Sequence, residues 1–150
     1  MKTIFEKDII EDFVTRISKV NSQSKPLWGK MNSFQMLKHC SECTKSNLGE
    51  RTDKRSFISY IFGKMTLNKI VKDDKPVGKN APTFPAFVIT ESGDVEYQKK
   101  QLISLVRNYA TREKSSFEGT VHPFFGKMTA HQIGILDYKH LDHHLRQFGV

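Results

Sequence analysis

The segment Tyr138–Gln147 reads YKHLDHHLRQ and places His140, His143 and His144 within five consecutive residues. Histidines at positions i and i+4 of a helix lie on one face with their Cβ atoms about 5–6 Å apart, so they can share one metal ion. A fourth histidine, His39, lies far upstream on another predicted helix. If His39 meets the C-terminal helix, the chain contains a three-histidine metal site.

The 3.6-residue period of an α-helix indicates which of the clustered histidines lie on the apolar face of the helix. His140 and His144 fall about 40° apart within an apolar arc, and His143 lies at the edge of that arc. The arc is defined by Ile133, Leu136, Leu141 and Phe148. The opposite face, which we expect to lie in solvent, carries Lys139, Asp142 and Arg146.

Two inward imidazoles need polar partners, because burying them without hydrogen bonds costs free energy. A metal ion bound by both would satisfy the two rings at once. Histidines that are hydrogen-bonded within an ordinary core are the alternative interpretation. The spacing alone does not choose between the two.

Neighbouring residues suggest two other ligand sets. His39, Cys40 and Cys43 have the residue types of a zinc site, but both cysteines adjoin apolar helix positions, which favours buried reduced thiols. Asp137 precedes His140 by three residues, so its carboxylate is a candidate ligand or an acceptor that orients an imidazole.

Other polar residues of the C-terminal region have less specific roles. Gln147 follows His144 by three residues and is a candidate hydrogen-bond partner of that ring. Ordinary contacts between helices are the alternative for both Asp137 and Gln147. We expect His122 and His131 to be capping or surface residues.

Length and charge narrow the class of protein. A chain of 150 residues suffices for one domain with a core, which we place at 1–150. It lacks an apolar run long enough to span a membrane and an N-terminal stretch typical of a signal peptide, so we expect a cytoplasmic protein. The net charge of +8 is spread along the chain without a nucleic-acid-binding signature, so nucleic acid is not the expected partner.

Apolar spacing together with helix-capping residues predicts four main helices. The first spans about 5–20, and the charged segment Glu50–Arg55 follows the second. The later three helices are predicted to begin at Asn32 or Ser33, at Asp94 and at Thr129.

The middle of the chain is predicted to contain a fifth, shorter helix and a long loop. The helical piece covers 57–71 and is interrupted at Gly63. Residues 72–92 contain several prolines and form a surface loop in which Phe84 and Phe87 dock on the core. With no convincing strand, the prediction is an all-α four-helix bundle with a long crossover loop and a short extra helix.

A short sequence recurs three times and predicts helix starts. Gly29–Asn32, Gly63–Thr66 and Gly126–Thr129 each read Gly-Lys-Met followed by Asn or Thr. The glycine would bend the chain, and the Asn or Thr side chain would cap the first turn of a helix.

Three segments carry a resemblance to a known family. Lys139–Gln147, KHLDHHLRQ, resembles the last-helix motif of the DinB-like (YfiT-type) metal-binding superfamily. Trp28–His39, WGKMNSFQMLKH, resembles the segment in which that family places its first ligand. His122–Thr129, HPFFGKMT, resembles one branch of the family, a domain of unknown function.

The resemblance implies a fold and a set of ligands. The implied fold is an up-down-down-up four-helix bundle around a divalent metal, most often zinc or nickel. Carried over residue by residue, the ligands are His39, His140 and His144. The candidates for orienting these ligands or lining the pocket are His143, Asp137, Gln147 and Trp28, of which His143 matches a position that is frequently histidine without being a ligand.

The resemblance also implies a range of functions. Members with known activity are thiol-dependent transferases and isomerases that use low-molecular-weight thiols such as bacillithiol or mycothiol, and homodimers are common. We therefore expect a metal-dependent thiol S-transferase or a hydrolase acting on a small molecule. The alternative is a non-enzymatic, metal-stabilised binding or stress-response module.

Overall fold

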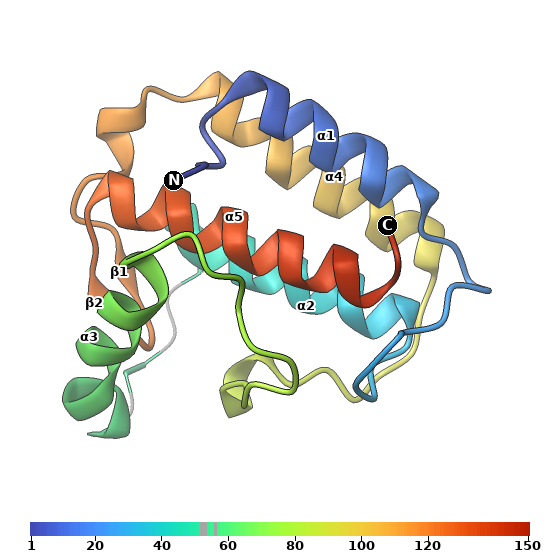
Figure 1. Ribbon diagram of the computed structural model, residues 1–150, viewed down its shortest axis with the longest axis horizontal. Helices are drawn as coiled ribbons and strands as arrows, with labels where there is room; N and C mark the ends of the chain where they lie inside the picture. The colour runs from blue at the N-terminus through green and yellow to red at the C-terminus, as the bar shows by residue number, and fades with distance from the viewer. Residues whose placement is uncertain (52–53, 56) are drawn as a thin grey trace.

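The computed structural model describes residues 1–51, 54–55 and 57–150. The described chain is mostly helical, in agreement with the predicted all-α class, and contains five α-helices and two short 3-10 helices (Figure 1). The α-helices are α1 (Lys7–Lys19), α2 (Ser33–Asn47), α3 (Phe57–Val71), α4 (Val95–Thr111) and α5 (Ala130–Gln147). The 3-10 helices are η1 (Pro85–Phe87) and η2 (Lys114–Phe117).

Four of the helices surround the main core. Helices α4 and α5 each contact both α1 and α2. In Figure 1, α1 and α5 run in one direction along the molecule, and α2 and α4 run in the opposite direction. Helix α1 shows how the core is formed, because its buried residues recur at helical spacing as Ile9, Ile10, Phe13, Val14 and Ile17.

The prediction that the chain has no strand was wrong. Strand β1 (Val121–His122) pairs antiparallel with β2 (Gly126–Lys127) in a small hairpin. Two-residue strands are too short to show the alternation of apolar and polar residues that identifies a strand in sequence. The turn between them is held by the His122 Nδ1 atom, which accepts hydrogen bonds from the backbone N–H groups of Phe124 and Phe125.

Two of the three Gly-Lys-Met segments start helices as predicted. Asn32 caps α2 and Thr129 caps α5, and each forms a reciprocal capping box with the glutamine three residues later. The third interpretation was wrong, because Thr66 lies inside α3. Helix α2 ends at Asn47, before the charged segment 50–55, of which residues 52 and 53 lie outside the described residues.

Helix α3 is continuous, so the predicted interruption at Gly63 was also wrong. The helix packs on α5 and on the hairpin. A Cβ atom at Gly63 would lie far inside contact distance of the Phe124 carbonyl oxygen, so the absent side chain allows helix and hairpin to approach closely. Gly63 is therefore a packing position.

The loop between α3 and α4 docks on the core as predicted. Phe87 is almost fully buried, and the Phe84 ring stacks on Phe124 with centroids 3.4 Å apart. Because these two aromatic residues bring the loop against α2 and the hairpin, they position it beside the histidines described below.

We predict that Gly63→Ala destabilises the protein by about 1–3 kcal/mol, because the new methyl group meets backbone that cannot rotate away. Gly78→Ala is the matched control, since a Cβ atom there has no neighbour within 4 Å. Urea unfolding of both variants measures the difference. Equal stability of the Gly63→Ala variant and the wild type would contradict the close packing of α3.

Candidate metal centre

The structure brings three histidines from two helices together. His39 lies on α2, and His140 and His144 lie one turn apart on α5. One potential ligand atom from each residue lies within 4.8 Å of the other two. The three ring centroids form a nearly equilateral triangle with sides of 4.7–5.0 Å. Helix α5 therefore supplies the pair that its periodicity predicts, and α2 adds the third ring.

The hydrogen bond of His39 to the loop defines its tautomer. Its Nδ1 atom lies 2.9 Å from the Phe87 carbonyl oxygen. A carbonyl oxygen only accepts hydrogen bonds, so Nδ1 must carry the proton. The Nε2 atom of His39 is consequently unprotonated, and it lies 3.0 Å from His140 Nε2 and 3.8 Å from Cys43 Sγ.

The tautomer of His144 is defined by a relay through Gln147. The Gln147 Nε2 atom donates to the Trp28 carbonyl oxygen at 2.7 Å, so the amide oxygen must face the opposite way. That oxygen accepts a hydrogen bond from His144 Nδ1 at 2.9 Å. His144 therefore also carries its proton on Nδ1, which leaves its Nε2 atom with a free lone pair.

His140 is the ring without a complete set of partners. Its Nδ1 atom is buried and has no hydrogen-bond partner within the described residues. If His140 simply donated from Nε2 to His39, its Nδ1 atom would remain a buried acceptor without a donor. The Nδ1 atom lacks a partner among the described residues in either tautomer, so the atom of His140 that faces the other rings is Nε2.

Burial keeps all three rings neutral. Desolvation lowers the pKa of His144 to about 3, and the neighbouring His39 adds to the effect. Desolvation, followed by His144 and His39, holds the pKa of His140 well below its ordinary value. Desolvation also lowers the pKa of His39, although the hydrogen bond to Phe87 opposes it. Neutral imidazoles are the form that binds metal ions.

The arrangement fits a divalent transition metal. Zinc–nitrogen bonds of about 2.0–2.1 Å in tetrahedral geometry separate two ligand nitrogens by roughly 3.3 Å. The 3.0 Å between the Nε2 atoms of His39 and His140 is close to this value. Gln147 and the Phe87 carbonyl occupy the positions of the outer hydrogen-bond acceptors that orient metal-binding histidines. Three nitrogen ligands would leave at least one coordination position of such a metal ion open.

His143 and Trp28 lie beside the three rings. His143 stacks edge-on with His144 and with Trp28, and its Nδ1 atom lies 3.3 Å from the Val77 carbonyl oxygen of the loop. The Lys79 ammonium group lies 4.5 Å from the centroid of the Trp28 ring. The indole therefore contacts both His143 and the Lys79 side chain.

Asp137 belongs to a separate polar cluster. Its carboxylate accepts hydrogen bonds from Thr44 Oγ and from the Asn47 amide, and the Tyr109 hydroxyl faces it. Desolvation raises the pKa of Asp137 to about 6 despite these donors. The structure thus places Asp137 in contacts between helices, one of the two roles that the sequence left open, and does not join it to the three rings.

The cysteines are free thiols, as predicted. Cys40 Sγ faces Met36 Sδ, and Cys43 Sγ lies 3.8 Å from His39 Nε2. Desolvation raises the pKa of both thiols well above the ordinary value, so neither is a thiolate at neutral pH. Because only the three histidines converge as a potential ligand group within the described residues, a Cys/His zinc site is not favoured.

Two side chains differ from their predicted environments. Lys139, expected in solvent, is buried and donates to the Ile70 and Asp73 carbonyl oxygens at the end of α3. His122, expected to be a capping or surface residue, is buried in the hairpin, where its ring accepts hydrogen bonds from the backbone of the turn, whereas His131 is exposed. Both corrections depend on α3 and the hairpin covering this end of α5, and the periodicity of a single helix contains no signal for such a cover.

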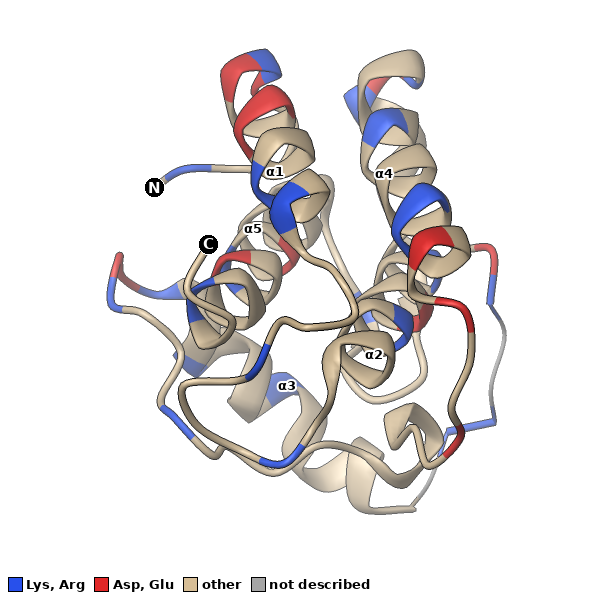
Figure 2. Ribbon diagram, turned by 90° about the vertical axis from the view of Figure 1, so that its right-hand side faces the viewer, with Lys and Arg blue, Asp and Glu red and all other residues tan. Residues whose placement is uncertain are grey.

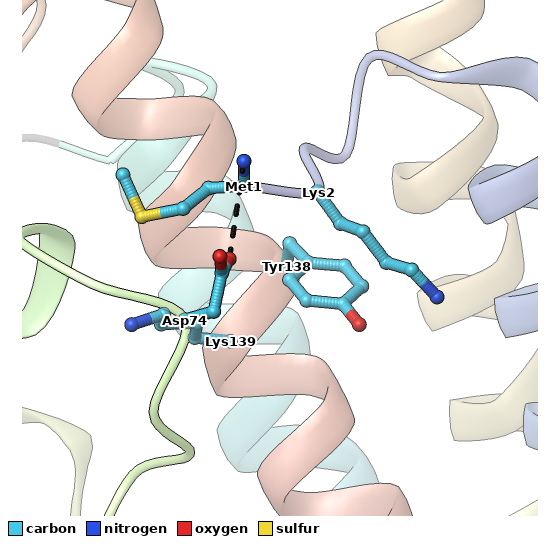
Figure 3. A pocket seen from close by; sticks show the side chains of 5 residues that line it. All are labelled: Met1, Lys2, Asp74, Tyr138 and Lys139. Carbon is cyan, nitrogen blue, oxygen red and sulfur yellow. Dashed lines mark ion pairs between the residues drawn. The ribbon is translucent and has the colours of Figure 1, made fainter.

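A surface pocket beside α5 is not part of the histidine cluster. Figure 3 shows that it is lined by Met1, Lys2, Asp74, Tyr138 and Lys139. The ammonium groups of the two lysines point to opposite sides of the view, and Asp74 pairs with the N-terminal amine at 3.9 Å. The pocket therefore lacks convergent groups that would bind a charged ligand.

Comparison with known proteins identifies a family. The model of a family described as "Protein of unknown function (DUF1569)" matches residues 7–149. No curated protein and no solved structure matches the chain.

The burial of neutral histidines makes stability depend on pH. His144 has a pKa of about 3 in the folded protein, below its ordinary value of 6.5. Its contribution to the free energy of unfolding is therefore present above pH 6.5 and is lost as the pH falls towards 3. Each such group contributes up to about 1.4 kcal/mol per pH unit to the slope. We predict that the free energy of unfolding of the metal-free protein falls more steeply between pH 6.5 and 5 in the wild type than in His144→Gln.

Urea titrations in the presence of a chelator measure this slope. The pKa of Asp137 is raised to about 6, so its effect on the free energy of unfolding has the opposite pH dependence. The stability that it contributes is lost as the pH rises through that value. It is present in both proteins, so the difference between their slopes isolates His144. His131→Gln, at an exposed position, is the control. Identical slopes for the wild type and His144→Gln would contradict a buried neutral His144.

Proposed function

The chain belongs to the DUF1569 family of proteins of unknown function, and we propose that it is a divalent-metal-binding protein whose ligands are His39, His140 and His144. The observation that carries this proposal is the orientation of the rings. The protons of His39 and His144 are held on Nδ1 by a loop carbonyl and by Gln147, so their Nε2 lone pairs remain free for a metal ion. His140 completes the set, because its Nε2 atom lies 3.0 Å from that of His39.

We further infer that the protein is a member of the DinB-like superfamily with an up-down-down-up four-helix bundle. The antiparallel directions of the four core helices support this inference. The placement of one histidine on α2 and of two on α5 supports it independently. Zinc and nickel are the metals that we propose, since both accept imidazole ligands readily.

We propose an enzymatic role as a metal-dependent thiol S-transferase or hydrolase acting on a small molecule. A divalent metal held by three neutral imidazoles supplies a Lewis acid that lowers the pKa of a water or thiol to near neutrality. The chain itself keeps the rings unprotonated, and Trp28, whose ring Lys79 contacts, packs on the neighbouring His143. A cation in this position favours an anionic substrate, such as a low-molecular-weight thiol that carries carboxylates.

The second candidate is a non-enzymatic binding or stress-response module stabilised by the metal. It is supported by the origin of the ligands, because one ion bound by His39 and His140 would connect α2 to α5. We also keep as proposals a cytoplasmic location, to which the free thiols Cys40 and Cys43 are suited, and a homodimeric state.

We predict that His140→Ala abolishes stoichiometric metal binding, whereas His131→Ala, which removes an exposed histidine of the same helix, leaves it unchanged. Elemental analysis of protein reconstituted with zinc or nickel measures the difference. Failure of the wild type to retain either metal would contradict the proposed function.

The same two variants distinguish the enzymatic from the structural role. A catalytic site predicts that His140→Ala loses activity in a screen of thiol transfer and hydrolysis while its melting temperature stays close to that of the metal-free wild type. A structural site predicts that metal raises the melting temperature of the wild type strongly, with no activity in the screen. The His131→Ala control should behave as the wild type in both measurements.

We predict that Gln147→Met weakens metal binding by about 10–100-fold, because His144 loses the acceptor that orients its ring. Gln147→Glu should restore only part of the affinity, since a carboxylate accepts from Nδ1 but cannot donate to the Trp28 carbonyl oxygen. Gln101→Met, an exposed position on α4, is the control. Competition titrations with a metal-sensitive dye measure the affinities, and an unchanged affinity in Gln147→Met would exclude the orienting role.

A further inference from the structure

Helix α3 exposes an unusually apolar surface. Six of the eleven large hydrophobic residues that are exposed within the described residues lie on this one helix. They are Phe57, Ile58, Tyr60, Ile61, Phe62 and Met65, with exposed fractions between 46% and 78%. Contiguous apolar surface of this kind marks a site of interaction with a protein or a membrane.

Five of these residues form one face of the helix. At 100° per residue, Phe57, Ile58, Ile61, Phe62 and Met65 fall within an arc of about 140°. We call these five residues the α3 apolar face. The buried residues Ser59, Gly63 and Leu67 occupy the opposite side and pack on the rest of the molecule. The helix therefore packs through Ser59, Gly63 and Leu67 and presents its aromatic residues outward.

The borders of the α3 apolar face are positively charged. Lys64 and Lys69 lie at its two edges by the same rotation, and neither forms an ion pair with a residue that the structure describes. The sequence from Lys54 to Lys72 contains five basic residues and no acidic one. Figure 2 shows the same absence of acidic residues on α3.

Helix α3 is held firmly at the periphery of the molecule. It lies at one end of the structure, outside the four core helices (Figure 1). Gly63 packs against the hairpin backbone, and the buried Lys139 donates to the Ile70 and Asp73 carbonyl oxygens at the C-terminal end of the helix. The α3 apolar face is thus presented by a rigid element.

We propose that the α3 apolar face docks on the surface of an anionic phospholipid bilayer. Large apolar side chains on one face, with lysines at the borders, are the features of a helix that lies in the plane of a membrane interface. The apolar residues would enter the boundary between headgroups and acyl chains, and Lys64 and Lys69 would contact the phosphates. The net charge of +8 attracts the whole protein to such a surface.

No helix within the described residues is long and apolar enough to cross a bilayer. Charge favours the bilayer surface over a second copy of the chain as the partner of this face. A second copy docked on the same face would bring lysines against lysines, and α3 has no acidic residue to pair with them. The inference is independent of the metal site, which lies between α2 and α5.

The proposal is tested by co-sedimentation of the full-length protein with phosphatidylglycerol-containing vesicles and with pure phosphatidylcholine vesicles. The wild type should bind the anionic vesicles, and binding should weaken as salt is raised. Ile61→Ser/Phe62→Ser should reduce binding by about tenfold or more, because two apolar anchors are removed. Tyr97→Ser, which removes an exposed aromatic residue of α4, should bind as the wild type.

The contribution of Lys64 and Lys69 to vesicle binding is tested against a control variant with the same change in net charge. Lys64→Glu/Lys69→Glu should weaken binding roughly tenfold. Lys100→Glu/Arg107→Glu changes the net charge by the same amount at exposed positions of α4 and should weaken binding much less. Circular dichroism and thermal unfolding establish that each variant is folded.

Three results would overturn the proposal. Absence of wild-type binding to anionic vesicles excludes the membrane as partner. Equal loss of binding in the two charge-reversed variants assigns any attraction to net charge alone and not to the α3 apolar face. If Ile61→Ser/Phe62→Ser converts a dimer into a monomer in light scattering while leaving vesicle binding unchanged, the face is a contact between copies of the chain.

Discussion

The position of the proton on Nδ1 of His39 and of His144 determines what the histidine cluster can bind. A carbonyl oxygen of the loop accepts a hydrogen bond from the Nδ1–H group of His39, and the Gln147 amide oxygen accepts one from that of His144. The Gln147 amide is itself oriented by the Trp28 carbonyl. Both rings are thereby left with free Nε2 lone pairs in a region where burial prevents protonation. The hydrogen bonds that orient these rings involve four segments of the chain. These are helices α2 and α5, the connection before α2 and the loop before α4.

The neighbouring polar groups show why such a site tolerates burial. Asp137 lies one helical turn before His140, yet its carboxylate accepts hydrogen bonds from Thr44 and Asn47 and faces the Tyr109 hydroxyl. A carboxylate beside the rings would have raised their pKa values and favoured protonation. Its engagement with α2 and α4 keeps the histidine cluster free of acidic neighbours. The same interaction supplies the buried carboxylate with the hydrogen bonds that it needs.

Much of the helical structure could be predicted from sequence because its signals are local. Ile9, Phe13 and Ile17 identify α1 by spacing alone, and Asn32 and Thr129 identify two helix starts by their capping chemistry. Helix α3 was interpreted wrongly for a physical reason. Gly63 is a helix-breaking signal within an isolated segment, but here the packing of α3 against the hairpin backbone requires a residue without a side chain. The hairpin itself was missed because its strands are too short to carry a pattern.

The candidate site likewise has features that follow from local sequence patterns and features that depend on tertiary contacts. The sequence by itself determined that His140 and His144 share the inward face of one helix, because the 3.6-residue period places residues i and i+4 together whatever surrounds them. Only the tertiary structure decided that His39 completes the cluster and that Lys139 is buried beneath α3. It also decided that the Trp28 carbonyl orients Gln147, which in turn orients His144. These contacts join residues that are distant in the chain, and their geometry follows from how whole helices and loops pack, which no local pattern encodes.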